Sequence, residues 1–283
     1  MKLLRVGEVG KEKPAMLLDD GRVVDVSSQT RDFDGAFFAG GGVEKLMGVR
    51  KGPLPTIDLK DKRVGACVAR PWKVIGIGLN YADHAKESGM AIPPEPVVFM
   101  KASNTVVGPN DTVLIPRGSK KTDWEVELGV VMGKTARYLP DKESALSYVA
   151  GYCISNDVSE REFQLERGGG WDKGKSAETF NPLGPWLVTT DEIPDPQFLG
   201  MTLDVNGVRR QTGNTRTMVF DVRHLVWYLS QFLVLEAGDV ITTGTPPGVG
   251  LGQKPTPIYL KENDVMELTI EGLGKQRQVL RQA

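Results

Sequence analysis

Three acidic residues alternate with apolar ones in the segment DWEVELGVV at 123–131. Asp123, Glu125 and Glu127 would share one face of a β-strand, because successive side chains of a strand point to opposite sides. One interpretation is a half-solvated strand with an acidic outer face. The other is a buried acidic cluster, which is favoured because the chain turns fully apolar at 130–132.

Buried carboxylates need a positive partner, since ionised groups are costly in apolar surroundings and like charges repel. Asp157 ends a second apolar segment and is the candidate for a third ligand beside Glu125 and Glu127. Ser159 can cap the helix that follows, which leaves Asp157 available. Oxygen ligands alone favour Mg²⁺ or Mn²⁺ over zinc, which prefers histidine and cysteine. Asp123, near the start of the strand, is the weaker candidate.

The first of the two histidines could be part of a general base. His84 follows the apolar segment GIGLNY, and Glu87 comes three residues later. On a helix these two side chains are neighbours, and a carboxylate beside an imidazole orients it and raises its basicity toward water. The alternative is a solvated pair on a short surface helix. His224, within the helical pattern at 217–235, is expected at the flank of that helix.

Polar and glycine-rich segments supply further candidates. Lys175 lies in a long loop, where a lysine near a metal could stabilise a developing oxyanion; otherwise it is simply solvated. Gly244 and Thr245 of TGTPPGVG could bring an N–H group and a hydroxyl to an anionic substrate, or could belong to a plain turn. The remaining substrate-binding candidates are Tyr81 and Lys101, which each end an apolar segment, and Gln211 and Asn214 of the polar turn before residue 217.

The composition excludes several classes of protein. Lys plus Arg total 35 and Asp plus Glu total 36, so the net charge is −1, which gives no electrostatic case for nucleic acid or an anionic membrane. No apolar run approaches the roughly 18 residues that span a bilayer, and the start lacks the apolar core of a signal peptide. Cys67 and Cys153 lie in apolar segments and predict buried free thiols. We therefore expect a cytoplasmic protein without a nucleic-acid or membrane partner.

The chain is predicted to have two parts, a small N-terminal α/β domain at 1–70 and a larger catalytic domain at 71–283. Strand patterns dominate, and the regular alternation of strand and helix that builds a parallel sheet is missing. The predicted fold class is therefore α+β, mainly β, with a mixed β-sandwich roll and a few packed helices. The predicted strands of the larger part include 97–101, 112–115, 124–132 and 149–156, and its longest helix is 217–235.

From about residue 71 onward the sequence resembles the fumarylacetoacetate hydrolase family. The similar segments occur in the family's order: GLNYADHAKESG, VVFMKASNTVVGP, DWEVELGVVMGK, GYCISNDVSEREFQ, KGKSAETFNPLGPW, LDVNGVRRQTGNTRTMVF and GDVITTGTPPGVG. The N-terminal part also resembles the opening of the bacterial sugar-acid branch. Within that branch the sequence is most similar to 2,4-diketo-3-deoxy-L-rhamnonate and L-fuconate hydrolases.

The resemblance implies a β-sandwich roll that holds one Mg²⁺ or Mn²⁺ and forms homodimers or larger assemblies. The longer fumarylacetoacetases use a fourth carboxylate as a metal ligand. No residue of this sequence is assigned to that position, and this points away from fumarylacetoacetate as the substrate. The implied roles are metal ligation by Glu125, Glu127 and Asp157, water activation by His84 and Glu87, oxyanion stabilisation by Lys175, and substrate contact by Thr245.

The predicted function is metal-dependent hydrolysis of a C–C bond in a 2,4-diketo acid. A 2,4-diketo-3-deoxy sugar acid would give pyruvate and a hydroxy acid. The alternatives are an acylpyruvate hydrolase, a decarboxylase of oxaloacetate or a related keto acid, and an isomerase of unsaturated keto acids. A non-catalytic protein that binds small dicarboxylates is the alternative outside enzymes.

Overall fold

The computed structural model describes residues 1–50, 52–87 and 91–283, without the side chains of residues 84–86. The strands are β1 (Lys2–Val6), β2 (Lys13–Leu17), β3 (Val23–Asp25), β4 (Thr56–Ile57), β5 (Val64–Gly65), β6 (Val74–Gly78), β7 (Val97–Lys101), β8 (Val106–Val107), β9 (Val113–Ile115), β10 (Thr122–Asp123), β11 (Val126–Met132), β12 (Val149–Asn156), β13 (Ser159–Glu160), β14 (Asn181–Thr189), β15 (Gly200–Val205), β16 (Val208–Asn214), β17 (Val240–Thr242), β18 (Val265–Ile270) and β19 (Gly274–Gln282). The helices are α1 (Gly35–Ala39), α2 (Gly42–Val49), α3 (Ala82–Glu87), α4 (Arg161–Leu165), α5 (Asp172–Lys175) and α6 (Val222–Ser230), with short 3₁₀ turns at η1 (Ser103–Thr105), η2 (Ala145–Tyr148), η3 (Pro196–Phe198), η4 (Thr215–Thr217) and η5 (Gly250–Gly252).

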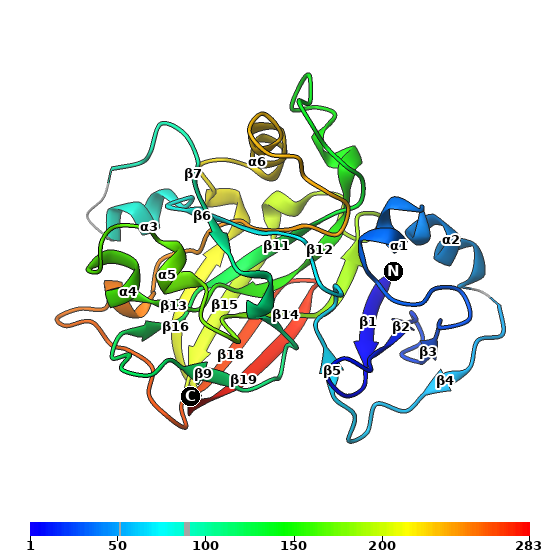
Figure 1. The fold of residues 1–283 in the computed structure, drawn as a ribbon, viewed down its shortest axis with the longest axis horizontal. Coiled ribbons are helices and arrows are strands. Elements are labelled where there is room, and N and C mark those ends of the chain that lie inside the picture. Colours follow the sequence, from blue (N-terminus) through cyan, green and yellow to red (C-terminus); the bar gives the residue numbers. More distant parts are fainter. Residues whose placement is uncertain (51, 88–90) are drawn as a thin grey trace.

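Two large sheets dominate the part of the chain that is described (Figure 1). One has twelve strands in the order β4-β3-β2-β1-β14-β12-β11-β17-β6-β7, with β5 beside β1 and β8 beside β14. The other has five, in the order β16-β15-β18-β19-β9. Most neighbours are antiparallel, whereas β17 and β6, β14 and β8, and β19 and β9 are parallel. The predicted fold class, mainly β with mixed strand directions, is confirmed.

Strand β11 is buried at every position because apolar cores cover both of its faces. Val126 and Leu128 belong to the core shared with β15 and β18 of the second sheet. Val131 faces the other way, into a core that includes Phe37 of α1 and Cys153 of β12. The apolar run at the end of this strand therefore has the two-sided burial that the sequence predicted.

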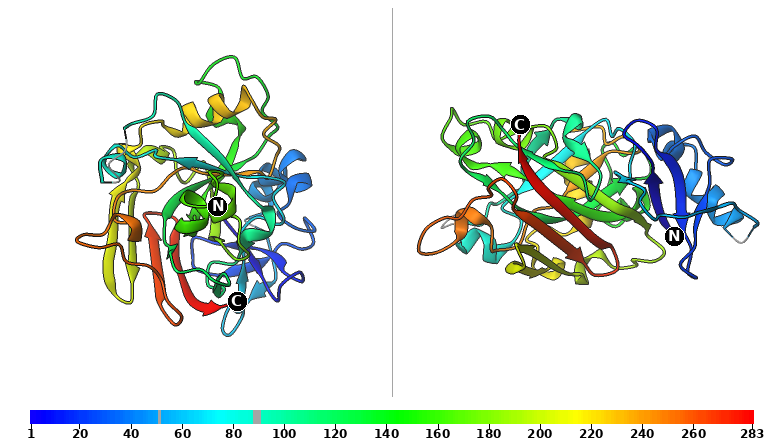
Figure 2. Two further views of the ribbon diagram at one scale, coloured as in Figure 1. Left: turned by 60° about the vertical axis from the view of Figure 1, so that its left-hand side comes forward. Right: turned by 90° about the horizontal axis from the view of Figure 1, so that it is seen from below.

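The N-terminal strands extend the twelve-stranded sheet, since β1 pairs antiparallel with β14. Figure 2 shows them at one end of the molecule, with β18 and β19 running across the rest. Two short helices, α1 and α2, follow β3 in the sequence. The break between them falls at Gly41, whose φ of 67° lies in the left-handed region that glycine adopts at little cost. The division of the chain at residue 70 stays a prediction.

Helix α6 is shorter than the pattern at 217–235 predicted. Asp221 ends the preceding extended segment and caps the helix by accepting a hydrogen bond from the backbone N–H of His224 at 2.7 Å. The ring of His224 is half-buried and its Nδ1 lies 2.8 Å from Nζ of Lys142, which agrees with the flank position expected. Among the described residues, none of the helices combines the length and apolar character needed to cross a membrane.

The predicted cap of the helix after Asp157 is wrong. Helix α4 starts later than expected, and Glu160 caps it by accepting a hydrogen bond from the N–H of Phe163 at 2.7 Å. Ser159 instead belongs to β13, and its hydroxyl donates to the backbone oxygen of Asp157 at 2.9 Å. Asp157 is not a helix cap, as expected, but the reason is that the short strand β13 lies between Asp157 and α4.

Candidate active site and metal centre

Three carboxylates converge where β11 begins and β12 ends. Glu127 lies in β11, Glu125 precedes that strand, and Asp157 follows β12. Antiparallel pairing of the two strands sets them opposite each other, and the N–H of Asp157 donates to the backbone oxygen of Glu125 at 3.0 Å. One oxygen from each carboxylate lies within 4.8 Å of the others, and all three residues are buried. The structure thus brings together the three residues that the sequence nominated as metal ligands.

Buried cations hold two of these carboxylates at both oxygens. Arg161 donates to Oε1 of Glu125 at 2.6 Å. Nζ of Lys175 lies between Oε2 of Glu125 at 2.8 Å and Oδ2 of Asp157 at 2.6 Å. Lys101 donates to Oδ1 of Asp157 at 2.5 Å. Burial lowers the pKa of Lys175, but Asp157 and Glu125 outweigh it, so that pKa is raised above its ordinary value.

Glu127 is held by neutral donors instead. Thr242 donates its hydroxyl to Oε2 of Glu127 at 2.5 Å, and the N–H of Gly244 donates to the same oxygen at 2.8 Å. Within the described contacts Glu127 has no ion pair. Burial raises the pKa of this carboxyl well above its ordinary value, and the nearby Asp157 and Glu125 raise it further.

The charge balance fits a divalent cation. With every group ionised, the buried cluster together with Asp123 has four carboxylates against the cations of Lys101, Arg161 and Lys175, which leaves one negative charge in excess. The donors are carboxylate oxygens, the ligands that Mg²⁺ and Mn²⁺ prefer. The residues present therefore fit a hard divalent cation.

Asp123 is bound by Arg161 and by the loop at 248–254. It forms an ion pair with Nε of Arg161 at 2.8 Å. Its two oxygens also accept the N–H groups of Gly250 at 2.6 Å and Leu251 at 2.9 Å. Asp123 therefore connects the loop at 248–254 to the cation that holds Glu125, which agrees with its exclusion from the predicted ligands.

Two predicted substrate-binding residues fix the backbone between the acids. Gln211 accepts the N–H of Val126 at 3.0 Å, and Thr245 donates its hydroxyl to the backbone oxygen of Val126 at 2.9 Å. Gln211 also donates to the hydroxyl of Thr245 at 2.8 Å. Because Val126 separates Glu125 from Glu127, these contacts set the spacing of both carboxylates.

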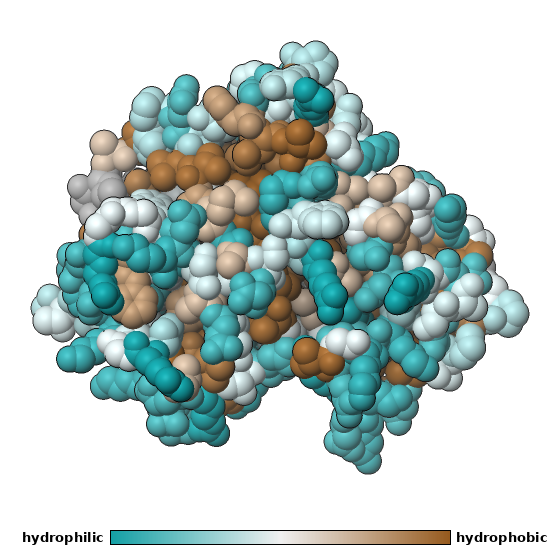
Figure 3. All heavy atoms as spheres, viewed as in Figure 1, coloured by the Kyte–Doolittle hydropathy of each residue, from teal (hydrophilic) through white to brown (hydrophobic). Residues whose placement is uncertain are grey.

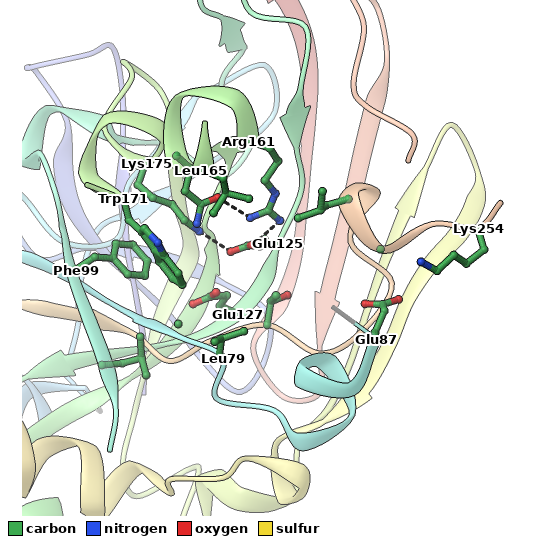
Figure 4. Close-up of a pocket in the computed structure, with 16 residues that line it drawn as sticks. Leu79, Glu87, Phe99, Glu125, Glu127, Arg161, Leu165, Trp171, Lys175 and Lys254 are labelled. Carbon is green, nitrogen blue, oxygen red and sulfur yellow. Dashed lines mark hydrogen bonds and ion pairs between the residues drawn. The ribbon is translucent and has the colours of Figure 1, made fainter. Parts of the chain in front are cut away.

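A cavity of about 330 Å³ opens onto this cluster (Figure 4). Of the residues nominated from the sequence, Glu87, Glu125, Glu127, Lys175 and Thr245 line it. Figure 4 places Glu87 across the cavity from Glu125 and Lys175. The complete lining is Ile77, Gly78, Leu79, Glu87, Phe99, Glu125, Glu127, Arg161, Gln164, Leu165, Trp171, Lys175, Thr245, Leu251, Gly252 and Lys254.

Glu87 is fixed by the loop after β17. The N–H of Gly248 donates to both carboxylate oxygens of Glu87 at 3.0 Å. A Cβ atom on Gly252 would lie 2.5 Å from Cδ of Glu87, so a larger residue there would displace this carboxylate from its position. The side chain of His84, the proposed partner of Glu87, lies outside the part of the chain that the structure describes.

Four further nominated residues that the structure describes, Tyr81, Lys101, Asn214 and Gly244, do not line the cavity. The hydroxyl of Tyr81 donates to Sδ of Met201 at 3.2 Å, inside the core. Asn214 caps η4 by accepting the N–H of Arg216 at 3.0 Å. Gly244, with φ of 96°, directs its N–H at Glu127, and Lys101 is buried against Asp157, as described above. Contact of these residues with a substrate stays a prediction, and their observed contacts are structural.

Several cavity residues had no predicted role. Arg161 and Gln164 lie three residues apart on α4 and are hydrogen-bonded at 3.0 Å, a spacing visible in the segment SEREFQ. Phe99 alternates with Lys101 in β7, and its ring lies 4.9 Å from Nζ of Lys175. Trp171 packs on Phe99 with 5.6 Å between ring centres. These two rings had no signal in the sequence beyond ordinary apolar character.

Comparison with known proteins identifies the family. Residues 73–281 match the family described as fumarylacetoacetate (FAA) hydrolase C-terminal. Over 283 residues, and with complete coverage of both chains, the sequence is 57% identical to a Burkholderia multivorans protein named "Putative hydrolase". The chain belongs to the fumarylacetoacetate hydrolase family and is a hydrolase.

Two solved structures resemble the whole chain. Fumarylacetoacetate hydrolase from the psychrophilic Exiguobacterium antarcticum is 36% identical, with a TM-score of 0.82 and complete coverage of both chains. Maleylpyruvate hydrolase from Sphingobium sp. SYK-6, in complex with manganese(II) ion and pyruvate, is 27% identical, with a TM-score of 0.81 and the same coverage. Together with the family, these structures support hydrolysis of acylpyruvate-like compounds and a divalent metal.

Substitution of Glu127, the acid of the cluster for which the described contacts include no ion pair, tests the metal centre. Glu127→Gln keeps the shape of the side chain but removes one ligand charge. The affinity for Mn²⁺ is therefore expected to fall about 100-fold or more, because even substitutions outside the ligand shell change metal affinity 10- to 100-fold. Lys175→Met is expected to tighten Mn²⁺ binding, because it removes a competing cation from two carboxylates. Titration calorimetry of the metal-free protein measures both. Glu178→Gln, at an exposed carboxylate, is the control, and wild-type affinity in Glu127→Gln would remove the cluster as the metal site.

Proposed function

We propose that this enzyme hydrolyses the C3–C4 bond of a 2,4-diketo acid, with a 2,4-diketo-3-deoxy sugar acid as the substrate. The products are pyruvate and a hydroxy acid. One observation carries the proposal: a single cavity joins the acid cluster and Lys175 on one wall to Glu87 on the other. The sugar-acid assignment is supported by the resemblance of the N-terminal part to that branch of the family.

Glu125, Glu127 and Asp157 would hold Mg²⁺ or Mn²⁺. When bound, such an ion supplies the positive charge that polarises a keto oxygen and stabilises negative charge formed next to it. The manganese reported with the Sphingobium maleylpyruvate hydrolase supports the assignment of a divalent cation. Magnesium as the ion used in the cell is part of the proposal.

Glu87 on the other wall and His84 would together activate water. His84, oriented by Glu87, takes a proton from a water molecule, and the resulting hydroxide attacks the C4 carbonyl carbon. The C3–C4 bond then breaks, its electron pair passes to C3 as the enolate of pyruvate, and C4 becomes the carboxyl carbon of the second product. The proton that His84 took from water is then returned to C3, which converts the enolate to pyruvate and balances the reaction. The N–H of Gly248, 3.0 Å from each oxygen of Glu87, keeps that carboxylate in place.

The cations beside the acid cluster would stabilise the enolate. Lys175 is a buried ammonium whose pKa is raised by Asp157 and Glu125 against the effect of burial, so it stays charged at neutral pH. Arg161 lines the same cavity. Fixed positive groups of this kind stabilise developing negative charge without reorganisation. Lys175 is therefore the residue proposed to bind the leaving enolate oxygen.

A substrate screen tests the function. The purified enzyme with added Mg²⁺ or Mn²⁺ is incubated with 2,4-diketo-3-deoxy sugar acids, simple acylpyruvates and oxaloacetate, and mass spectrometry identifies the products. Pyruvate with the matching carboxylic acid, formed fastest from a sugar acid, is the expected result. Release of CO₂ from oxaloacetate without cleavage of any diketo acid would contradict the proposal and indicate a decarboxylase.

The water-activating pair can be separated from the metal centre. His84→Ala and Glu87→Gln are each expected to lower kcat about 100-fold or more, because positioned general bases contribute 10²- to 10⁴-fold. Calorimetric Mn²⁺ affinity should stay within about threefold of wild type, since neither residue belongs to the acid cluster. Unchanged turnover in His84→Ala would exclude the pair from catalysis.

We also propose that the chain forms a homodimer through the edge of its larger sheet. Strand β7 ends the order of that sheet, and its Val98 is 39% exposed. Phe232, just after α6, is 67% exposed. Figure 3 shows apolar residues gathered on the face that carries β7 and α6. A strand at the end of a sheet with exposed apolar residues near it is typical of a contact surface.

Light scattering tests the dimer. The expected mass is twice that of the 30.9 kDa chain, and Val98→Lys is expected to shift it toward the single chain by placing a charge at the contact. The substitution Val208→Lys, at another exposed apolar residue, is the control. A wild-type mass of one chain would contradict the proposal.

A further inference from the structure

One lysine of the cavity has no place in the mechanism above. Lys254 lines the cavity beyond η5, in the loop at 248–254 that follows β17. Figure 4 shows its amine on the side of Glu87, across the cavity from Glu125 and Lys175. The lysine thus lies opposite the end where the cation and the pyruvate half of the substrate would bind.

The loop that carries Lys254 has a fixed position relative to the acid cluster. Its Gly250 and Leu251 donate their N–H groups to Asp123, which pairs with Arg161. The side chain of Gln253 closes the loop by donating to the backbone oxygens of Gly248 at 3.0 Å and Val249 at 3.3 Å. The backbone next to Lys254 is therefore linked through Asp123 to Arg161, which holds Glu125.

Among the described cations that line the cavity, Lys254 is the one whose charge has no partner. Of the cations that line the cavity, Arg161 is bound to Asp123 and Glu125, and Lys175 is bound to Glu125 and Asp157. Across the described residues, no hydrogen bond or ion pair to the Lys254 ammonium is found. An exposed ammonium on the lining of the cavity has three donors to offer to a substrate.

We propose that Lys254 determines specificity by donating a hydrogen bond to an oxygen on the far end of the acyl chain. This inference rests on the proposed function, because the diketo end must face Glu127 and Lys175 for the tail to reach the opposite wall. The substrates selected are acylpyruvates whose tail carries a hydroxyl or a carboxylate, rather than an alkyl tail. A sugar acid belongs to the hydroxylated group.

The two kinds of oxygen make different demands on the residue at this position. A tail hydroxyl needs a donor, so Lys254→Gln should retain most of the preference that Lys254→Met loses. A tail carboxylate needs the charge as well, so Lys254→Gln should behave like Lys254→Met. Raising the ionic strength should weaken only the second kind of contact, because salt screens exposed charges.

The experiment measures kcat and KM of wild type and both Lys254 variants. The probes are acetylpyruvate, a 2,4-diketo-3-deoxy sugar acid and a 2,4-diketo acid that ends in a carboxylate. Lys254→Met is expected to raise the KM of the preferred oxygen-bearing substrate. This increase should exceed the increase for acetylpyruvate by about tenfold or more, because the variant loses a hydrogen bond from a charged group. The change should appear mainly in KM, since the bond forms in both the ground and transition states.

Controls distinguish the inference from the proposed function. Lys261→Met removes an exposed lysine outside the cavity lining and is expected to leave all three substrates unaffected. An equal loss of kcat on every substrate in Lys254→Met would overturn the inference, because it would mean that the lysine acts through Glu87. Equal KM changes for all tails would also overturn it. If wild type cleaves none of the diketo acids, the proposed function itself is wrong.

Discussion

The structure depends on the burial of like charges at the junction of β11 and β12. Asp123, Glu125, Glu127 and Asp157 are all nearly inaccessible to water, and such a group would not remain together without cations. Removing one partner of a buried ion pair costs about 3–5 kcal/mol, because a charge is left without compensation. The cations from β7, α4 and α5 therefore do more than balance charge. They join segments far apart in the sequence around a single point.

The buried ion pairs also connect the acid cluster to the opposite wall of the cavity. Arg161 contacts Glu125 on one side and Asp123 on the other. Asp123 in turn holds the loop that closes against Glu87. The acid cluster, Glu87 and the loop at 248–254 are thus parts of one hydrogen-bonded assembly, so the distance between the two walls of the cavity is set by the fold.

Much of this site could be predicted from local patterns. The alternation at 123–131 indicated three acids on one face, of which Glu125 and Glu127 were the nominated ligands. The apolar segment before Asp157 indicated a further ligand at a neighbouring strand end. These signals are local in the chain, and pairing of β11 with β12 brings them together. The mainly β fold class followed from the dominance of strand patterns in the same way.

The partners of those acids could not be predicted, because they depend on long-range packing. Nothing near Gln211 or Thr245 indicates that both bind the backbone of Val126, since these residues meet only when the two sheets are assembled. Lys101 looked like a substrate ligand because it ends a strand, yet the fold buries it against Asp157. Residue type indicated the chemistry in these cases, whereas tertiary structure decided whether the side chain faces the cavity.

Hydrolysis in isotopically labelled water tests the central claim most directly. If water attacks the C4 carbonyl, cleavage of an acylpyruvate in H₂¹⁸O must place ¹⁸O in the carboxylate of the acid released from the acyl half. Mass spectrometry of that acid at early times is expected to show the label, with pyruvate formed in equal amount. Cleavage without the label in that carboxylate, or release of CO₂ in its place, would contradict the hydrolytic account.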